Sequence, residues 1–156
     1  MTRAVNVIDP STIEPDTRST YPEHLQDAVR GRAKRRLASR AGLSNLSAVQ
    51  VELPAGCASS LRVWHSHEDE LIIVLKGEIT VVTGETEVVA RAGDVVGFPA
   101  GEPDGHQLVN RAAEPAAFIE VASFADANIS TYPDHDLLQI PNGRGRSFVR
   151  RDGTPY

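Results

Sequence analysis

Residues 63–77 read VWHSHEDELIIVLKG and residues 93–110 read GDVVGFPAGEPDGHQLVN, and these two stretches decide the fold that the sequence predicts. Both combine short runs of β-branched and apolar residues, which are typical of strands, with glycine or proline, which are typical of turns. Side chains alternate along a strand, so residues two positions apart share a face. If the faces that carry His65, Glu70 and His106 point into one interior, two imidazoles and a carboxylate converge there.

Further short strands flank these two stretches. We predict strands at Leu46–Leu53, Leu61–His65, Glu70–Leu75, Glu78–Thr83, Thr86–Ala90, Asp94–Phe98, His106–Asn110 and Ala116–Ala122. Turn residues punctuate these runs, and the pattern between residues 46 and 122 does not indicate a helix. Regularly spaced short strands with turns between them predict a β-sandwich or a β-barrel. The predicted fold class is therefore all-β.

The two ends of the chain differ from this central region. Residues 1–20 predict an extended arm with one edge strand at Ala4–Ile8. Residues 22–40 predict one helix, because Pro22 suits a first turn and the arginine-rich end suits the helix dipole. The polar tail predicts one late strand near Ser147–Arg150. We therefore expect an N-terminal arm and short helix packing on the barrel at 1–45, the barrel at 46–125 and a C-terminal extension at 126–156.

Length and composition describe an ordinary globular domain. The chain has 156 residues, of which 40% are hydrophobic and 24% charged, as is usual for one domain. The formal net charge of −5 disfavours nucleic acid as a partner, because nucleic-acid binding needs clustered lysine and arginine. Cys57 is the only cysteine, which suits a reducing compartment, and no segment resembles a secretory signal or a membrane span. We expect a cytoplasmic protein with no membrane partner.

One stretch is basic despite the overall charge. It contains Arg30, Arg32, Lys34, Arg35, Arg36 and Arg40. A solvated basic turn or helix is the simpler interpretation. The other is a contact with an anionic substrate or a phosphate, because arginine suits oxyanions. Removing the charges of Arg35 and Arg36 and measuring the affinity for an anionic ligand would separate the two interpretations.

The residue spacing in the first stretch resembles the first motif of the cupin family. That motif runs Gly, five or six residues, His-x-His, three or four residues, Glu, six residues and Gly. Glu70 and Gly77 match its second half, and His65, with four residues between it and Glu70, matches the second histidine. The first histidine then falls on Val63, and His67 is an additional histidine two residues beyond His65.

The second stretch resembles the second cupin motif, which runs Gly, five residues, Pro-x-Gly, two residues, His, three residues and Asn. Gly93 and the segment Pro99–Gly101 match it, and so do His106 and Asn110. The linker before His106 is two residues longer than in the motif, which puts Asp104 where the histidine would stand without the insertion. We therefore keep Asp104 as a residue that supports the site or substitutes for a ligand.

The resemblance to small single-domain bacterial cupins of the RmlC-like kind implies a double-stranded β-helix, the jelly-roll barrel. It also implies a single divalent metal ion (Fe, Mn, Ni or Zn), and imidazole with carboxylate is a ligand set that such metals accept. His65, Glu70 and His106 are the expected ligands, and His67 or Asp104 is the candidate for the position of the missing histidine. Glu70 is also the expected catalytic residue, as a ligand or as a general base.

The resemblance leaves an enzyme and a binding module open, ahead of a storage or structural cupin, which a single barrel without a signal peptide makes the last choice. The first is an enzyme that acts at the metal on a small polar metabolite with a carbonyl or carboxylate group, by isomerase, lyase or dioxygenase chemistry. The second is a non-catalytic module that binds or senses a small molecule with a degenerate metal site, which the valine at position 63 favours. We also expect a homodimer, because the arm and the tail have little core of their own and two-fold dimers are the commonest assembly.

Overall fold

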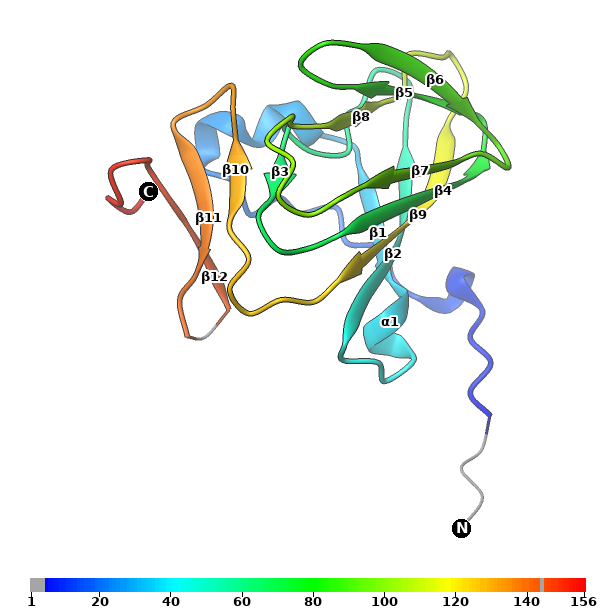
Figure 1. The fold of residues 1–156 in the computed structure, drawn as a ribbon. Coiled ribbons are helices and arrows are strands. Elements are labelled where there is room, and N and C mark those ends of the chain that lie inside the picture. Colours follow the sequence, from blue (N-terminus) through cyan, green and yellow to red (C-terminus); the bar gives the residue numbers. More distant parts are fainter. Residues whose placement is uncertain (1–4, 144) are drawn as a thin grey trace.

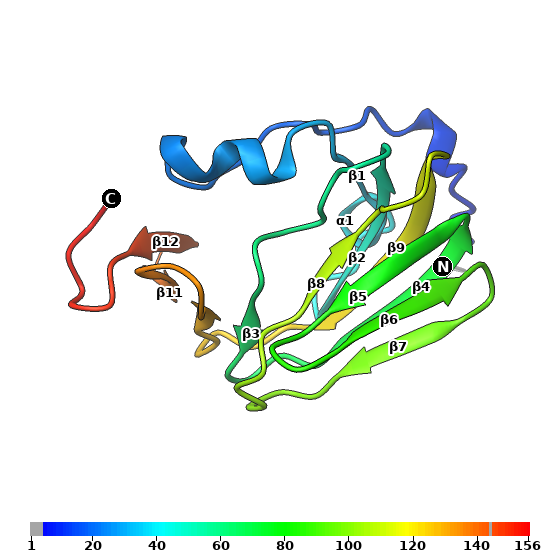
Figure 2. The same ribbon diagram turned by 90° about the horizontal axis from the view of Figure 1, so that it is seen from above.

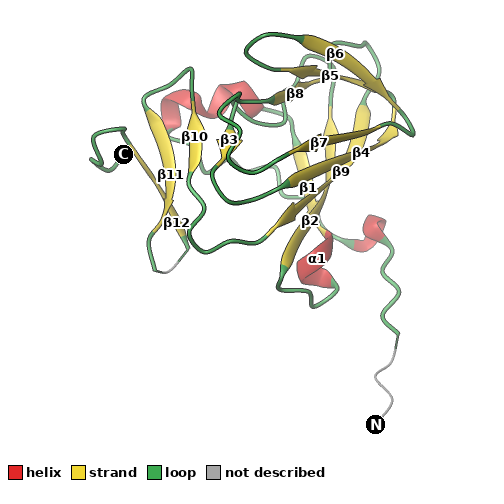
Figure 3. Ribbon diagram, viewed as in Figure 1, coloured by secondary structure: helices red, strands yellow, loops and turns green. Residues whose placement is uncertain are grey.

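Short antiparallel strands dominate the computed structural model, which describes residues 5–143 and 145–156 (Figures 1 and 3). The strands are β1 Ala33–Arg36, β2 Leu46–Leu53, β3 Trp64–His65, β4 Glu70–Lys76, β5 Glu78–Val82, β6 Glu87–Arg91, β7 Val95–Phe98, β8 Gln107–Val109, β9 Ala116–Ser123, β10 Ser130–Tyr132, β11 Leu137–Pro141 and β12 Arg146–Val149. The helical elements are the 3-10 helices η1 Pro10–Thr12 and η2 Glu23–Val29 and the single-turn α1 Leu37–Arg40. The all-β prediction is confirmed.

Two of the sheets face each other and form a barrel of the jelly-roll type. One sheet has the strand order β1-β2-β9-β4-β7, and the other has the order β6-β5-β8. A third sheet, with the order β12-β11-β10-β3, lies beside the barrel. In the view from above, the barrel strands lie on one side of the molecule and β11 and β12 on the other, with the N-terminal segment running across both (Figure 2).

The apolar core fills the space between the two barrel sheets. Val51 and Leu53 of β2 are fully buried, and they alternate with polar residues along the strand. Phe118 of β9 lies opposite Val51 on one side and Val74 on the other, and it is also fully buried. Burial of such side chains is the main favourable term in folding, so this layer stabilises the barrel.

The same alternation brings two carboxylates inside the barrel. Glu120 follows Phe118 by two positions on β9, and Glu70 precedes Ile72 by two positions on β4, so both carboxylates lie on inner faces. In the register of β4 with β9, Ile72 lies opposite Glu120 and Glu70 lies opposite Ala122. The apolar core therefore ends at this edge of the barrel and a polar region begins.

The third sheet covers this polar edge. Trp64 and His65 of β3 pair with Thr131 and Ser130 of β10. A second cluster of buried residues joins the N-terminal segment to this sheet, and it consists of Tyr21, Val29, Leu61, Val63, Tyr132 and Leu137. His65 is thereby held where the barrel meets the C-terminal strands.

The single helix predicted at residues 22–40 is wrong. The helix η2 ends at Val29, and Gly31 adopts a φ of +94°, a left-handed conformation that a right-handed helix cannot contain. The chain then forms β1, in which Lys34 pairs with Val51, because β2 offers an open edge whose backbone groups need partners. All helical pieces in the described part of the chain are short, so no membrane-spanning helix is present there.

Two further predictions concern the ends of the chain. The edge strand predicted at Ala4–Ile8 is wrong for its described part: residues 5–8 form no strand, and Ala4 lies outside the described residues. The late strand predicted near Ser147–Arg150 is confirmed as β12. The sequence did not predict β10 and β11. Of these short strands, β10 pairs with β3, which is far away in the sequence, and β11 pairs with β10 and β12.

Replacing Phe118 by alanine is expected to lower the free energy of unfolding by about 3–5 kcal/mol, because a fully buried aromatic side chain leaves a cavity. Urea denaturation followed by circular dichroism measures the change. Val95→Ala, at an exposed position of β7, is the control and is expected to change the free energy of unfolding by less than about 0.5 kcal/mol. Equal losses in the two variants would contradict this assignment of the core.

Candidate functional site

Three polar side chains meet where the barrel joins the third sheet. His65 ends β3, Glu70 begins β4 and His106 directly precedes β8. One potential ligand atom from each residue lies within 4.8 Å of the other two. Nε2 of His106 lies 2.7 Å from Oε2 of Glu70, and Nε2 of His65 lies 3.8 Å from the same oxygen. The structure therefore brings together the three residues that the spacing predicted as ligands, and we refer to them as the triad.

The carboxylate of Glu70 is enclosed, with only 10% of its side chain exposed. Burial by itself raises the pKa of a carboxyl group. The hydrogen bond with His106, the nearby imidazoles of His106 and His65 and the ammonium group of Lys34 together outweigh burial and hold the pKa of Glu70 below its usual value. Glu70 is therefore ionised at neutral pH, which is the form that binds a cation or accepts a proton.

The imidazole of His65 is held in a neutral, oriented state. Burial lowers the pKa of His65, so the ring is uncharged at neutral pH. Its Nδ1 lies 3.1 Å from Oγ of Ser130 and 3.2 Å from Nδ2 of Asn128, and both of these residues are buried. These contacts fix the ring and leave Nε2 directed towards Glu70. The hydroxyl of Ser130 can accept a hydrogen bond from Nδ1, as the partner of a metal-binding histidine does, whereas the amide nitrogen of Asn128 can only donate.

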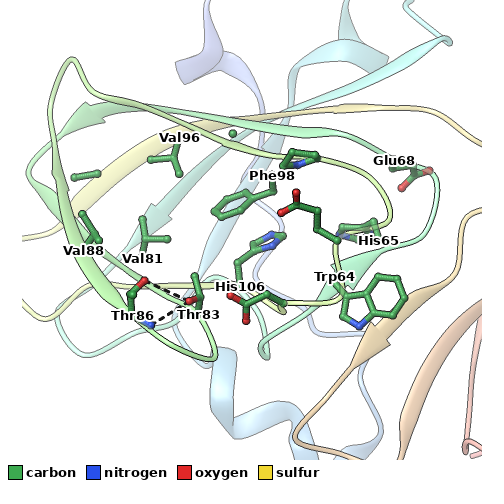
Figure 4. Close-up of a pocket in the computed structure, with 15 residues that line it drawn as sticks. Trp64, His65, Glu68, Val81, Thr83, Thr86, Val88, Val96, Phe98 and His106 are labelled. Carbon is green, nitrogen blue, oxygen red and sulfur yellow. Dashed lines mark hydrogen bonds between the residues drawn. The ribbon is translucent and has the colours of Figure 1, made fainter.

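The imidazole of His106 is buried against an aromatic ring. The rings of His106 and Phe98 are stacked with centroids 3.6 Å apart and planes within 5° of parallel (Figure 4). The backbone of His106 is held by Val63, since the His106 N–H donates to the Val63 carbonyl at 2.8 Å and the Val63 N–H donates to the His106 carbonyl at 2.9 Å. The ring therefore has little freedom to move away from Glu70.

Val63 occupies the position where the cupin motif has its first histidine. It is buried and lies directly opposite His106 in an antiparallel bridge, so the two side chains share a face. An isopropyl group has no lone pair, so this position contributes an apolar wall in place of a ligand.

The two residues considered as substitutes for that histidine lie outside the triad. His67 is exposed, and its Nδ1 lies 2.8 Å from Oγ of the neighbouring Ser66. Asp104 is exposed, accepts a hydrogen bond from the Gly84 N–H at 2.7 Å and lies 3.6 Å from the Arg62 guanidinium. Neither residue belongs to the group of potential ligand atoms that the described residues form around Glu70.

A polar network behind His65 was not predicted from the sequence. Arg146 donates from Nη2 to Oε1 of Glu68 at 2.5 Å, and Asn128 donates from Nδ2 to Oε2 of Glu68 at 2.9 Å. The His67 N–H donates to Oδ1 of Asn128 at 3.0 Å, which fixes the amide and turns Nδ2 towards His65. The sequence separations of 60 and 78 positions within this network mean that no local pattern could have revealed it.

His65 and His106 together line two cavities in the described part of the chain. The first, which we call the apolar cavity, has a volume of ≈ 350 Å³. Its walls include the side chains of Trp64, Val81, Val88, Val96 and Phe98 (Figure 4). It lies between the two barrel sheets, so a ligand there would contact apolar side chains and lie within reach of the imidazoles.

The second cavity, which we call the polar chamber, has a volume of ≈ 230 Å³ and also includes Glu70 in its lining. Its other polar walls include Tyr21, Arg32, Lys34, Glu120, Tyr132 and Gln139. Burial raises the pKa of Glu120, and the nearby carboxylate of Glu70 adds to that effect. The sequence carried a signal for Glu120, since it is the one charged residue in the apolar run AAFIEVAS of β9.

Comparison with known proteins identifies a family and a structural relative of this chain. The family model for the cupin domain matches residues 49–122. The crystal structure of a sugar phosphate isomerase from a cupin superfamily, from Silicibacter pomeroyi DSS-3, is 36% identical, with 97% of this chain and 96% of that chain covered and a TM-score of 0.92. No curated protein matches the sequence.

More distant structures share the fold. A predicted oxalate decarboxylase from Thermotoga maritima is 22% identical, with 77% of this chain and 100% of that chain covered and a TM-score of 0.62. The polyketide cyclase RemF from Streptomyces resistomycificus is 15% identical, with 77% of this chain and 80% of that chain covered and a TM-score of 0.63. With the family model and the relative from S. pomeroyi, these similarities establish that the chain belongs to the cupin superfamily as a small single-domain member.

Proposed function

We propose that the protein is an enzyme that acts on a small polar metabolite at one divalent metal ion held by His65, Glu70 and His106. The observation that carries this proposal is the convergence of one potential ligand atom from each residue within 4.8 Å, at the junction of two cavities. Perturbed ionisable groups in a concave site are typical of active sites.

The chemistry of the triad fits a metal ion. Two imidazoles and one carboxylate are the donor set of the facial triad, which leaves coordination positions open for substrate. His65 is neutral and Glu70 is ionised, as ligands must be. A bound Fe, Mn, Ni or Zn ion would act as a Lewis acid towards a carbonyl or hydroxyl oxygen.

The side chains around the triad have separate tasks in this proposal. The carboxylate of Glu70 lies 2.7 Å from Nε2 of His106 and is ionised. An ionised carboxylate at this place can serve as a metal ligand or take a proton from bound substrate. Phe98 stacks on His106 and keeps water from one side of the ring. Ser130 and Asn128 keep His65 oriented through its Nδ1.

Isomerase chemistry is the first of the reaction types that we propose, ahead of lyase and dioxygenase chemistry. The relative from S. pomeroyi is described as a sugar phosphate isomerase, and its similarity extends over 97% of this chain. Isomerisation of a sugar phosphate moves a proton between carbons next to a carbonyl group. A carboxylate beside an electrophilic centre is suited to that transfer.

A non-catalytic binding or sensing module is the rival function. The valine at position 63 favours it, because a cupin with one fewer histidine ligand holds a metal less tightly. Under this reading, the cavities would bind a small molecule and release it unchanged. The presence or absence of stoichiometric metal in the purified protein discriminates between the two functions.

We also propose that the protein is a cytoplasmic homodimer whose partner molecule is a small metabolite. The extended arm presents Val5 and Val7 with 89% of each residue exposed, and apolar side chains of this kind are suited to burial against a second copy. The single cysteine, Cys57, is a free thiol, which is compatible with a reducing compartment.

Loading the protein with each candidate metal is expected to give one tightly bound ion per chain and turnover of a sugar phosphate or a small carboxylic acid. His106→Ala is expected to lose both, because it removes one of two nitrogen ligands. Elemental analysis of the desalted protein and assays for isomerisation, decarboxylation and oxygen consumption measure these properties. His67→Ala, outside the triad, is the control and should keep both; equal turnover by metal-free protein would refute the proposal.

Val63→His is expected to tighten metal binding by about tenfold or more, a difference of about 1.4 kcal/mol. The new imidazole would stand opposite His106 and add a third nitrogen ligand. Competition with a chelator of known affinity measures the change. Val63→Leu adds bulk without a donor atom and should not tighten binding; a histidine variant that binds metal no better than the leucine variant would count against the position assigned to Val63.

Ser130→Ala is expected to weaken metal binding by about 10–100-fold, because partners of ligating histidines typically contribute that much. The serine Oγ lies 3.1 Å from Nδ1 of His65 and orients the ring. The same chelator competition measures the effect, with the exposed Ser47→Ala as the control. Unchanged affinity in the Ser130 variant would contradict the role assigned to Ser130 in orienting His65.

A further inference from the structure

We propose that the polar chamber binds the anionic group of the substrate, a carboxylate or a phosphate, between Arg32 and Lys34. This inference rests on the proposed function and adds to it the chemical class of the substrate. Neither residue belongs to the cupin motifs. Both side chains line the chamber, and neither forms a direct ion pair with a carboxylate of residues 5–143 or 145–156.

Strand β1 divides the basic stretch of residues 30–40 between two faces. Lys34 lies opposite Val51, a fully buried residue of the inner face of β2, and its side chain lines the polar chamber. Arg35 lies opposite Gln50 and forms an ion pair with Glu52 at 2.5 Å, away from the chamber. The two interpretations of the basic stretch therefore apply to different residues. The anionic-ligand interpretation fits Arg32 and Lys34, and it does not fit Arg35.

Arg32 is an unusually enclosed cation. Only 8% of the residue is exposed, and its Nη1 donates to the carbonyl oxygen of Ser59. No carboxylate of residues 5–143 or 145–156 forms an ion pair with Arg32 or with the ammonium group of Lys34. The carboxylates of Glu70 and Glu120 line the same chamber and act on these cations electrostatically without a direct ion pair. The planar fork of arginine matches the oxygens of a carboxylate or a phosphate. An incoming anion would therefore be stabilised between these two groups.

With the proposed metal ion bound, the charge of the chamber favours an anion. Its lining has two cations, Arg32 and Lys34, and two carboxylates, Glu70 and Glu120. Even with both carboxylates ionised these charges only cancel, and a divalent metal on the triad then leaves the chamber positive. Neutral hydrogen-bonding groups, the hydroxyls of Tyr21 and Tyr132, complete the polar wall without altering that balance.

The chamber adjoins the reacting centre directly. It shares His65, Glu70 and His106 with the triad, and its volume of ≈ 230 Å³ suits a small metabolite. An anionic group between Arg32 and Lys34 would fix one end of such a molecule beside the carboxylate of Glu70. The substrate class is therefore a small acid or phosphate ester whose carbonyl or hydroxyl lies close to its anionic group.

Calorimetric titration of the full-length, metal-loaded and desalted protein with inorganic phosphate and with acetate tests this inference. We expect at least one of the two anions to bind, and the tighter one identifies the substrate as a phosphate ester or a carboxylic acid. Lys34→Met, with Lys34→Gln as a second variant, is expected to raise the dissociation constant by about tenfold or more, because a hydrogen bond to a charged group is lost.

Arg36→Met is the matched control. It removes a cation from the same strand, but the Arg36 side chain is 65% exposed and lies outside the chamber. The dissociation constant of the Arg36→Met variant for the anion is expected to stay within about twofold of the wild-type value, since exposed ion pairs contribute little. The inference is overturned if neither anion binds to the wild-type protein, or if the Lys34 and Arg36 variants bind the anion equally well.

Elemental analysis of every sample separates this inference from the proposed function. Stoichiometric metal in a wild-type protein that binds neither anion would overturn the anion site alone. Lys34-dependent anion binding by a protein that takes up no metal would support the anion site and overturn the metal-dependent function. Anion binding that needs metal and is unaffected by both Lys34 variants would place the anion on the metal alone, and this result also overturns the inference.

Discussion

An ionised carboxylate inside a β-barrel has to be compensated, and the arrangement around Glu70 follows from that constraint. Glu70 begins β4 on the inner face of the barrel, and it is stabilised by the hydrogen bond with His106 at 2.7 Å and by the neighbouring imidazole of His65. His106 is held by backbone pairing with Val63, and His65 by the pairing of β3 with β10. The barrel and the third sheet are therefore both needed to build one small polar site.

The two cavities beside the triad differ in the polarity of their walls, and this difference would orient a bound molecule. The apolar cavity between the barrel sheets is lined by residues such as Val81 and Phe98, whereas the polar chamber contains Arg32, Lys34 and Glu120. A molecule with one anionic end would be oriented by these walls before any chemistry occurs. Such orientation is a large part of what an active site contributes to a reaction.

The barrel could be predicted from the sequence because its signals are local. Each strand between residues 46 and 122 shows its own apolar pattern, and the turns carry glycines such as Gly77, whose φ is +70°. A Cβ atom at this position would lie 3.1 Å from the carbonyl oxygen of Pro115. Crowding therefore explains why the motif has glycine, which lacks a Cβ atom, at this position. The prediction failed at residues 22–40, where Gly31 and the open edge of β2 outweigh local helix signals, and at β10, whose pairing with β3 is long-range. It also missed β11, which pairs with β10 and β12.

The sequence by itself determined which residues share a face of each strand, and its resemblance to the cupin motifs predicted that His65, Glu70 and His106 would converge. The tertiary structure brings them together from three different sheets. Only the tertiary structure decided that His67 and Asp104 lie outside the triad and that Val63 faces His106 without replacing the missing ligand. It also decided that Lys34 turns into the polar chamber while Arg35 pairs with Glu52 outside it. The physical reason is that alternation along one strand is encoded locally, whereas the partner of each face is set by how distant segments close the barrel.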